Sequence, residues 1–221
     1  MCLKKQREHN WNEIYAKRGN VFVEPLDEVK KFSQEVKQAG LHRVLDLGCG
    51  NGRHIIFLKK QGFDVWGMDN APEGLRLAQD WLKKEQLAAP LILADVHEPF
   101  PFRDNSFDAL ISTRVIHHAT QARVLGAVQE IIRVVRKGGM ILITVPGDAN
   151  RKSHHAWFGR HTLIKWIEPQ TYIPLGTHEK GIPHYVFTPE ELKTLFNDFA
   201  EVRIETGERK SIVLIARKYE H

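Results

Sequence analysis

The residue types best suited to chemistry occur in the stretch VLDLGCGNGR, Val44 to Arg53. Asp46 stands among apolar residues typical of a buried strand, and Gly48, Gly50 and Gly52 follow at alternate positions. Glycine permits positive φ and lets a ligand approach the main chain without a Cβ in the way. Because the amides that open the following helix lack partners within it, this stretch predicts a ligand-binding turn between a strand and a helix.

The spacing narrows the class of ligand. A dinucleotide fingerprint requires a third glycine at position 53, where this chain has Arg53. A phosphate-binding P-loop requires a Gly-Lys-Ser/Thr sequence, which does not follow the turn. The carboxylate of Asp46 disfavours a pyrophosphate but suits a ligand that carries an ammonium and a sulfonium group. Nicotinamide oxidoreductases and nucleoside triphosphatases are therefore disfavoured.

The pattern Asp46-x-Gly48-x-Gly50-x-Gly52 resembles the first motif of the class I S-adenosylmethionine-dependent methyltransferases, and later segments resemble the type 11 branch. The resemblance is strong over residues 40–145 and looser over 186–218. It implies an α/β fold, with a doubly wound, mostly parallel, seven-stranded Rossmann-like sheet whose last strand is antiparallel. It also implies S-adenosyl-L-methionine as cofactor, with the glycines around its methionyl portion.

Two further aspartates follow predicted strands. Asp69 ends a strand over 63–68 and lies where α/β nucleotide folds place a carboxylate on the ribose hydroxyls. The alternative is a helix-capping role, and both roles can hold if the helix over 72–87 is capped from Asn70 while Asp69 faces the ribose. Asp95 and Val96 follow a strand over 91–94, and the resemblance implies that they contact the adenine; a plain turn aspartate is the alternative. The cofactor-binding residues predicted in this way are Asp46, Gly48, Gly50, Gly52, Arg53, Asp69, Asn70, Asp95, Val96 and Ser112. Arg53 and Arg18 could each pair with the methionyl carboxylate or simply be solvated.

Paired histidines follow the predicted fourth strand, residues 107–112. In a doubly wound sheet the end of this strand lies opposite the glycine turn, so His117 and His118 are candidate catalytic residues. The Val-Ile-His-His segment also resembles the type 11 branch. Either histidine could accept a proton from a nitrogen or hydroxyl acceptor, whereas an anionic acceptor needs no base. A purely structural histidine is the alternative.

Residues 146–189 interrupt the regular alternation of strands and helices. Their aromatic and basic side chains are compatible with a substrate cap, an RNA-contacting surface, a metal site or a packing insertion. The histidines of this stretch have no compact spacing with cysteine or carboxylate partners, so the sequence predicts no metal. We favour a substrate cap, in which Trp157 joins Tyr15 from a helix over 8–18 as a substrate-binding residue.

The remaining elements complete a single domain, residues 1–221. Helices over 8–18 and 25–38 lie in an N-terminal segment, residues 1–39. Resemblance to family members that open with a similar Trp-x-x-Ile-Tyr segment implies a lid over the cofactor, and a helix that only covers the edge of the domain is the alternative. A helix over 122–136 is expected to end in a glycine cap at Gly138 and to lead into a strand over 140–145. A capping-box helix over 188–197 precedes two closing strands, 202–205 and 211–218.

Composition sets the outer limits of the prediction. The 221 residues carry a formal net charge of +5, two cysteines and 42% hydrophobic residues, as expected for a folded domain in a reducing compartment. No apolar run resembles a secretion signal or a membrane helix, so we expect a cytoplasmic protein without a membrane partner.

The acceptor is the most open part of the prediction. The sequence predicts methyl transfer from S-adenosylmethionine, with a small-molecule acceptor favoured over tRNA. The positive charge and a resemblance of the Val-Ile-His-His segment to tRNA wobble-uridine methyltransferases keep the tRNA alternative open. A non-catalytic S-adenosylmethionine-binding protein is the third possibility, and the oligomeric state is not predicted.

Overall fold

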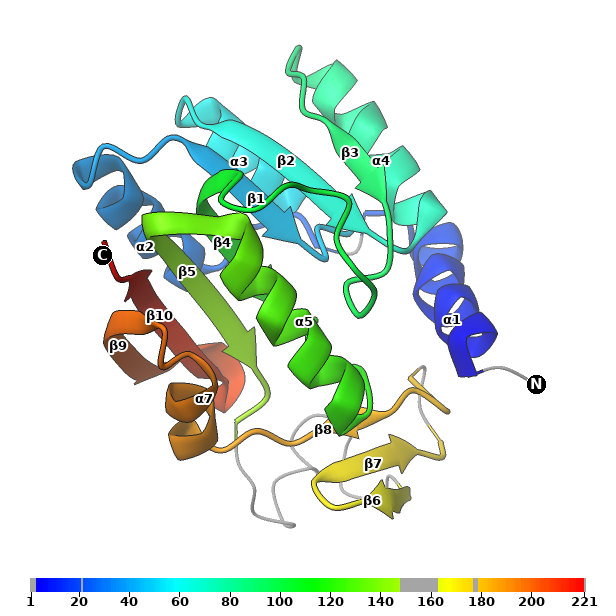
Figure 1. The fold of residues 1–221 in the computed structure, drawn as a ribbon. Helices are drawn as coiled ribbons and strands as arrows, with labels where there is room; N and C mark the ends of the chain where they lie inside the picture. The colour runs from blue at the N-terminus through cyan, green and yellow to red at the C-terminus, as the bar shows by residue number, and fades with distance from the viewer. Residues whose placement is uncertain (1–2, 21, 148–162, 177–178, 221) are drawn as a thin grey trace.

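The computed structural model describes residues 3–20, 22–147, 163–176 and 179–220. Its centre is a seven-stranded sheet in the order β3-β2-β1-β4-β5-β10-β9 (Figure 1). The paired strands from β3 to β5 are parallel, whereas β10 runs antiparallel to both β5 and β9. The predicted doubly wound sheet with an antiparallel closing strand is therefore confirmed. The strands are β1 (Arg43–Leu47), β2 (Asp64–Asp69), β3 (Leu91–Leu93), β4 (Phe107–Thr113), β5 (Val135–Val145), β9 (Phe199–Thr206) and β10 (Ile212–Lys218).

Helices cover both faces of this sheet, as Figure 1 shows. On one face, apolar residues of α5 and α7 pack with the sheet into one core; on the other, α2 and α3 form a second core. The helices are α1 (Leu3–Arg18), α2 (Asp27–Gln38), α3 (Arg53–Lys60), α4 (Pro72–Lys84), α5 (Gln121–Val134) and α7 (Pro189–Leu195). None of the described helices has the length and apolar character needed to cross a membrane.

Two predicted helix caps are wrong. Helix α5 ends at Val134 with Val135 as its C-cap, so Gly138 lies inside β5 at φ +70° and does not cap a helix. Helix α4 has Ala71, not Asn70, as its N-cap, and no side chain caps it from that position. Val135 and Met140 of β5 both pair with β4, and Gly138 lies in the irregular stretch between these two paired positions, so the strand continues past the glycine.

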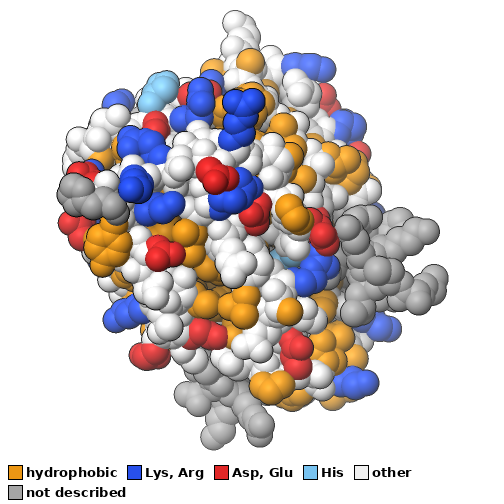
Figure 2. All heavy atoms as spheres, in the orientation of Figure 1, with side chains coloured by type: hydrophobic (Ala, Val, Ile, Leu, Met, Phe, Trp, Pro, Cys, Tyr) orange, Lys and Arg blue, Asp and Glu red, His pale blue; other side chains and the backbone are white. Residues whose placement is uncertain are grey.

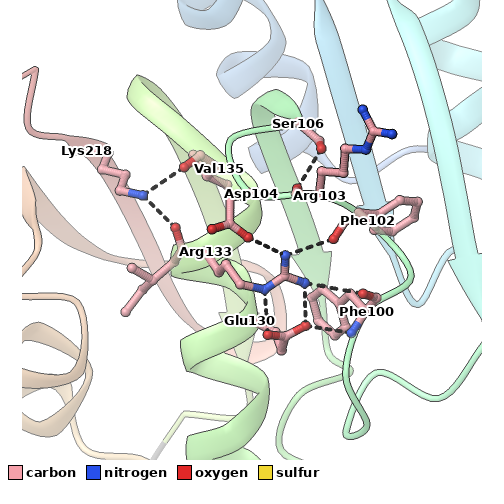
Figure 3. Close-up of polar contacts among 10 residues, drawn as sticks. Phe100, Phe102, Arg103, Asp104, Ser106, Glu130, Arg133, Val135 and Lys218 are labelled. Atoms are coloured by element: carbon pink, nitrogen blue, oxygen red, sulfur yellow. Dashed lines mark hydrogen bonds and ion pairs between the residues drawn. The ribbon is translucent and has the colours of Figure 1, made fainter.

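The loop between β3 and β4 is fastened to α5 by Arg133 (Figure 3). Its guanidinium donates to the carbonyl oxygens of Phe102 at 2.8 Å and Phe100 at 3.2 Å, and pairs with Asp104 at 2.8 Å. Glu130, one helical turn before Arg133 and paired with it, accepts from the Phe100 amide. These bonds hold the path of the loop that also carries the predicted adenine-binding residues.

A second, antiparallel sheet lies in the segment that the sequence predicted to be irregular. It consists of β6 (Ile164–Glu168), β7 (Thr171–Pro174) and β8 (His184–Tyr185) in that order. Strands of two to five residues give too little alternation to be recognised in the sequence. The capping box at α7 is confirmed, because Thr188 accepts from the Glu191 amide and Glu191 accepts from the Thr188 amide.

Candidate active site

A cavity lies where β1, β2 and β4 end, between the glycine turn, α1 and the second sheet. Residues from many segments of the chain line it, among them Tyr15, Gly50, Asn70, Val96, His117 and His184. The carboxyl ends of parallel strands are where ligands bind in doubly wound folds. The predicted cofactor turn and the paired histidines therefore share one cavity.

The glycine turn is shaped by its neighbours as well as by its own backbone. Gly48 has φ +77° and Gly50 has φ +53°, so both need the conformational freedom of glycine. A Cβ on Gly48 would overlap the side chain of Val115, and one on Gly50 would overlap the hydroxyl of Tyr15. The turn is thus wedged between α1 and the segment after β4.

Asp69 joins the glycine turn to the end of β2. Its carboxylate accepts from the Gly50 amide and from the Ala71 amide, both at 2.8 Å, and it is almost fully buried. Burial raises the pKa of Asp69, and the backbone hydrogen bonds oppose that rise. Asp69 also lines the cavity, so the carboxylate could accept from a ribose hydroxyl as well as support the turn.

Asp46 is a buried carboxyl group behind the turn. It is 1% exposed, and neither carboxylate oxygen has a hydrogen-bond partner among the described residues. The nearest ionisable partner is His54, whose Nδ1 lies 4.0 Å from Asp46 Oδ2. Burial raises the pKa of Asp46 to about 7, although the positive charge of Arg53 opposes this. Asp46 is not itself among the residues that line the cavity.

Asp95 is engaged by protein groups. It accepts from the His97 amide at 2.9 Å and pairs with Arg123 at 2.9 Å. Burial alone would raise the pKa of Asp95, but the bonds from His97 and the Arg123 charge prevail and hold it well below its usual range. Val96 and His97, rather than Asp95, line the cavity.

A cluster of three histidines lies at the other end of the cavity. His117 and His118 follow β4, His184 lies on β8, and the carboxylate of Glu179 is 3.4 Å from His184 Nε2 and 3.8 Å from His118 Nε2. Burial and the neighbouring cationic groups lower the pKa of His117 well below its usual value, so this imidazole is neutral at pH 7. Burial raises the pKa of Glu179 to about 7. Tyr172 stacks on His184 with ring centroids 5.1 Å apart.

The remaining predicted residues divide into two groups. Arg53, Asn70 and Tyr15 line the cavity. The guanidinium of Arg53 donates to the Glu24 carbonyl at 3.3 Å and lies over the Phe22 ring. Gly52 and Ser112 do not line it, Arg18 is exposed away from it, and Trp157 lies outside the described residues.

Sequence reasoning missed several residues that line the cavity. Arg114 has φ +60° directly after β4, a conformation unusual for arginine, and donates to the Glu208 carbonyl at 3.2 Å. Glu179 carries no motif, and His184 stood only among many aromatic and basic residues of its segment. Their proximity to His117 arises when β8 packs beside the segment after β4, where the Tyr185 amide donates to the His117 carbonyl. No local pattern could have indicated this contact.

Comparison with known proteins agrees with this geometry. Residues 45–143 match the methyltransferase domain family of type 11. A probable tRNA methyltransferase 9B of Homo sapiens is 32% identical over 166 residues, which cover 74% of this chain and 34% of that protein. A tRNA (carboxymethyluridine(34)-5-O)-methyltransferase of Xenopus tropicalis is 37% identical over 103 residues, 46% of this chain and 15% of that protein. The chain thus spans about a third or less of the length of these relatives.

A solved structure shares the whole fold. It is the 1,6-didemethyltoxoflavin-N1-methyltransferase of Burkholderia thailandensis with bound 1,6-didemethyltoxoflavin and S-adenosylhomocysteine. It superposes with a TM-score of 0.68 at 20% identity, covering 99% of this chain and 91% of that one. The sheet order and the glycine turn at its switch point define a class I methyltransferase fold. Residues 45–143, a little under half of the chain, match the type 11 methyltransferase domain, and the fold of the chain is the one that this solved structure shares.

Proposed function

We propose that this protein transfers a methyl group from S-adenosyl-L-methionine to a small-molecule acceptor. The observation that carries the proposal is the single cavity, which joins the glycine turn of a methyltransferase domain to a buried histidine cluster. Methyl transfer is an in-line displacement at the sulfonium methyl, so its main requirement is that donor and acceptor share one aligned, water-poor site.

The residues at the turn fit the cofactor. Asp46 offers two buried oxygens that lack partners among the described residues, directly behind the turn, and a positively charged ligand nearby would stabilise its ionised form. Asn51 and Arg53 line the cavity at the start of α3, where the helix dipole and the guanidinium favour the methionyl carboxylate. Asp69 and Asn70 would hold the ribose, and the Val96 region the adenine.

The acceptor end offers groups that can position a nucleophile and accept its proton. His117 and His118 remain the proposed catalytic residues, and Tyr15 a substrate contact, because all three line the cavity. Neutral His117 can accept a proton from an acceptor hydroxyl or nitrogen. The cofactor supplies the activated methyl group, and no covalent intermediate with the protein is required.

Three observations bear on the choice between a small-molecule acceptor and tRNA. On the face shown in Figure 2, basic side chains are interspersed with acidic ones. Several basic side chains of the described residues form ion pairs, such as Arg123–Glu98 and Arg136–Asp108. A continuous basic surface, as RNA binding favours, is not present on that face. The names of the two relatives compared above favour tRNA, which is the second candidate. The buried, histidine-lined end of the cavity favours a small molecule.

Calorimetric titration with S-adenosylmethionine, S-adenosylhomocysteine and NAD tests the cofactor assignment. We expect micromolar binding of both adenosyl ligands and none of NAD. Asp69→Asn should weaken binding at least about tenfold because it removes a charged ribose acceptor. Asp64→Asn at the opposite end of β2 is the matched control and should bind normally. Binding of NAD instead, or of no ligand to the folded wild-type protein, would refute the proposal.

Methyl transfer from a labelled donor then separates the acceptors. The protein is incubated in parallel with total tRNA and with an RNA-free small-molecule extract. Label in the small-molecule fraction supports the proposal, whereas label in tRNA establishes the second candidate. Tight binding of the adenosyl ligands without transfer to either fraction would favour a non-catalytic binding protein.

A further inference from the structure

Three histidines converge at the acceptor end of the cavity. His117 and His118 come from the turn after β4 and His184 from β8, and one ligand atom of each lies within 4.8 Å of those of the other two. All three are buried, and their ring centroids are 3.9, 4.8 and 5.5 Å apart. A general base requires one imidazole, so acid-base catalysis does not account for three in contact.

A carboxylate completes the cluster. Glu179 is 8% exposed, with Oε2 3.4 Å from His184 Nε2 and Oε1 3.8 Å from His118 Nε2. Ligand atoms around a tetrahedral zinc ion lie about 3.3 Å apart, because each bond is about 2.0–2.1 Å long. Small side-chain rotations would therefore bring the three imidazoles and the carboxylate onto one ion.

An independent observation concerns His117. Its Nδ1 is buried and has no hydrogen-bond partner among the described residues. Leaving a buried polar atom of this kind without a hydrogen bond destabilises the fold. A bound cation would supply the missing partner and relieve the mutual repulsion of converging imidazole lone pairs.

We propose that His117, His118, His184 and Glu179 form a binding site for a divalent transition-metal ion, with zinc as the first candidate. Neutral imidazoles and one carboxylate are borderline ligands that suit zinc, and similar ions such as cobalt can replace it. Rings packed against the cluster would hold the ligands in place, because Tyr172 stacks on His184 and Trp11 contacts His118 with centroids 5.8 Å apart.

A metal ion at this position would favour acceptors with a hydroxyl or thiol group, an inference that rests on the proposed function. With the ion bound, His117 and His118 act as its ligands instead of as the general base. An acceptor hydroxyl or thiol that binds the ion then has a lowered pKa and releases its proton to solvent. The resulting oxygen or sulfur anion attacks the methyl carbon of the cofactor. The carbon–sulfonium bond breaks, its electron pair stays on sulfur, and the products are S-adenosylhomocysteine and a methyl ether or thioether. The ion does not change its oxidation state.

Metal binding can be tested without any acceptor. The full chain is stripped with a chelator and titrated with zinc chloride in competition with a chromogenic chelator. In parallel, it is titrated with cobalt chloride and followed by visible absorption, which intensifies when the ion enters a four- or five-coordinate site. We expect one tight equivalent of zinc, with affinity reduced roughly 100-fold in His184→Gln and about 10-fold or more in Glu179→Gln. His42→Gln, a change at an exposed histidine, is the control and should bind as the wild type does.

The outcomes are decisive in either direction. Loss of the cobalt absorption in folded His184→Gln or folded Glu179→Gln supports the site, and the second variant serves if the first does not fold. Absence of a tight equivalent, or equal affinity in wild type and both folded variants, overturns it. Binding of S-adenosylmethionine to the wild-type protein is measured separately. If the wild type binds the cofactor but no metal ion, only the metal site is refuted. If the folded wild type does not bind the cofactor, the proposed function is refuted.

Discussion

Replacing Asp46 with asparagine should stabilise the fold in a strongly pH-dependent way. The pKa of this carboxyl group rises from its ordinary value of 3.8 to about 7 because the group is buried. Between these two pH values the unfolded chain has released the proton while the folded chain retains it, so the free energy of unfolding falls as pH rises. Above pH 7 the folded chain is also ionised and the loss is complete.

The size of the effect follows from the same values. The difference of about 3 between the two pKa values corresponds to about 4 kcal/mol of lost stability at pH 8, against less than about 2 kcal/mol at pH 5. Asparagine has no carboxyl proton to lose, so the stability of Asp46→Asn relative to wild type should improve by about 2–3 kcal/mol between pH 5 and pH 8. Any cost of burying the amide is common to both conditions and cancels in this comparison.

Urea unfolding of wild type and Asp46→Asn at pH 5 and pH 8, without cofactor, measures this quantity. Asp64→Asn, at a partly exposed carboxylate paired with Arg43, is the control and should change stability by less than about 1 kcal/mol. The same Asp46→Asn variant should bind S-adenosylmethionine more weakly, because the cofactor cation loses a negative charge behind the turn. A pH-independent difference between wild type and Asp46→Asn would refute the reasoning.

Three further substitutions probe the supports of the site. Gly50→Ala places a methyl group at the Tyr15 hydroxyl and forces a positive φ on alanine, so thermal unfolding should show a loss of about 1–3 kcal/mol, and calorimetry weaker cofactor binding. An unchanged affinity would contradict the close packing of α1 on the turn. Arg133→Met removes the hydrogen bonds that hold the loop after β3 on α5, and the free energy of unfolding in urea should fall by about 2 kcal/mol. The expected loss is no larger because the Arg133 side chain is partly exposed and solvent screens its charge. If Arg133→Met were as stable as the wild type, the hydrogen bonds from Arg133 would not contribute to stability. Thr188→Ala removes the capping box of α7 and should cost about 1 kcal/mol by the same measurement, with cofactor affinity unchanged as the control.

The sheet was predictable because its signals are local. Apolar runs followed by Gly48 or by Asp69 mark strand ends, and seven strands in this order leave few alternative topologies. Element boundaries were less predictable. Gly138 resembles a helix cap in the sequence, but in the structure it lies in an irregular stretch of β5, between the positions Val135 and Met140 that pair with β4.

The sequence by itself determined the fold class, the glycine turn and the presence of carboxyl groups and histidines near it, since each depends on residues close together in the chain. Only the tertiary structure decided what each side chain contacts. It placed Asp95 against Arg123, left Asp46 buried without a hydrogen-bond partner among the described residues, and brought Glu179 and His184 to the segment of His117 and His118. These contacts depend on how the small second sheet packs beside the end of β4. Contacts between distant segments leave no periodicity in a single sequence, so the histidine cluster became visible only in three dimensions.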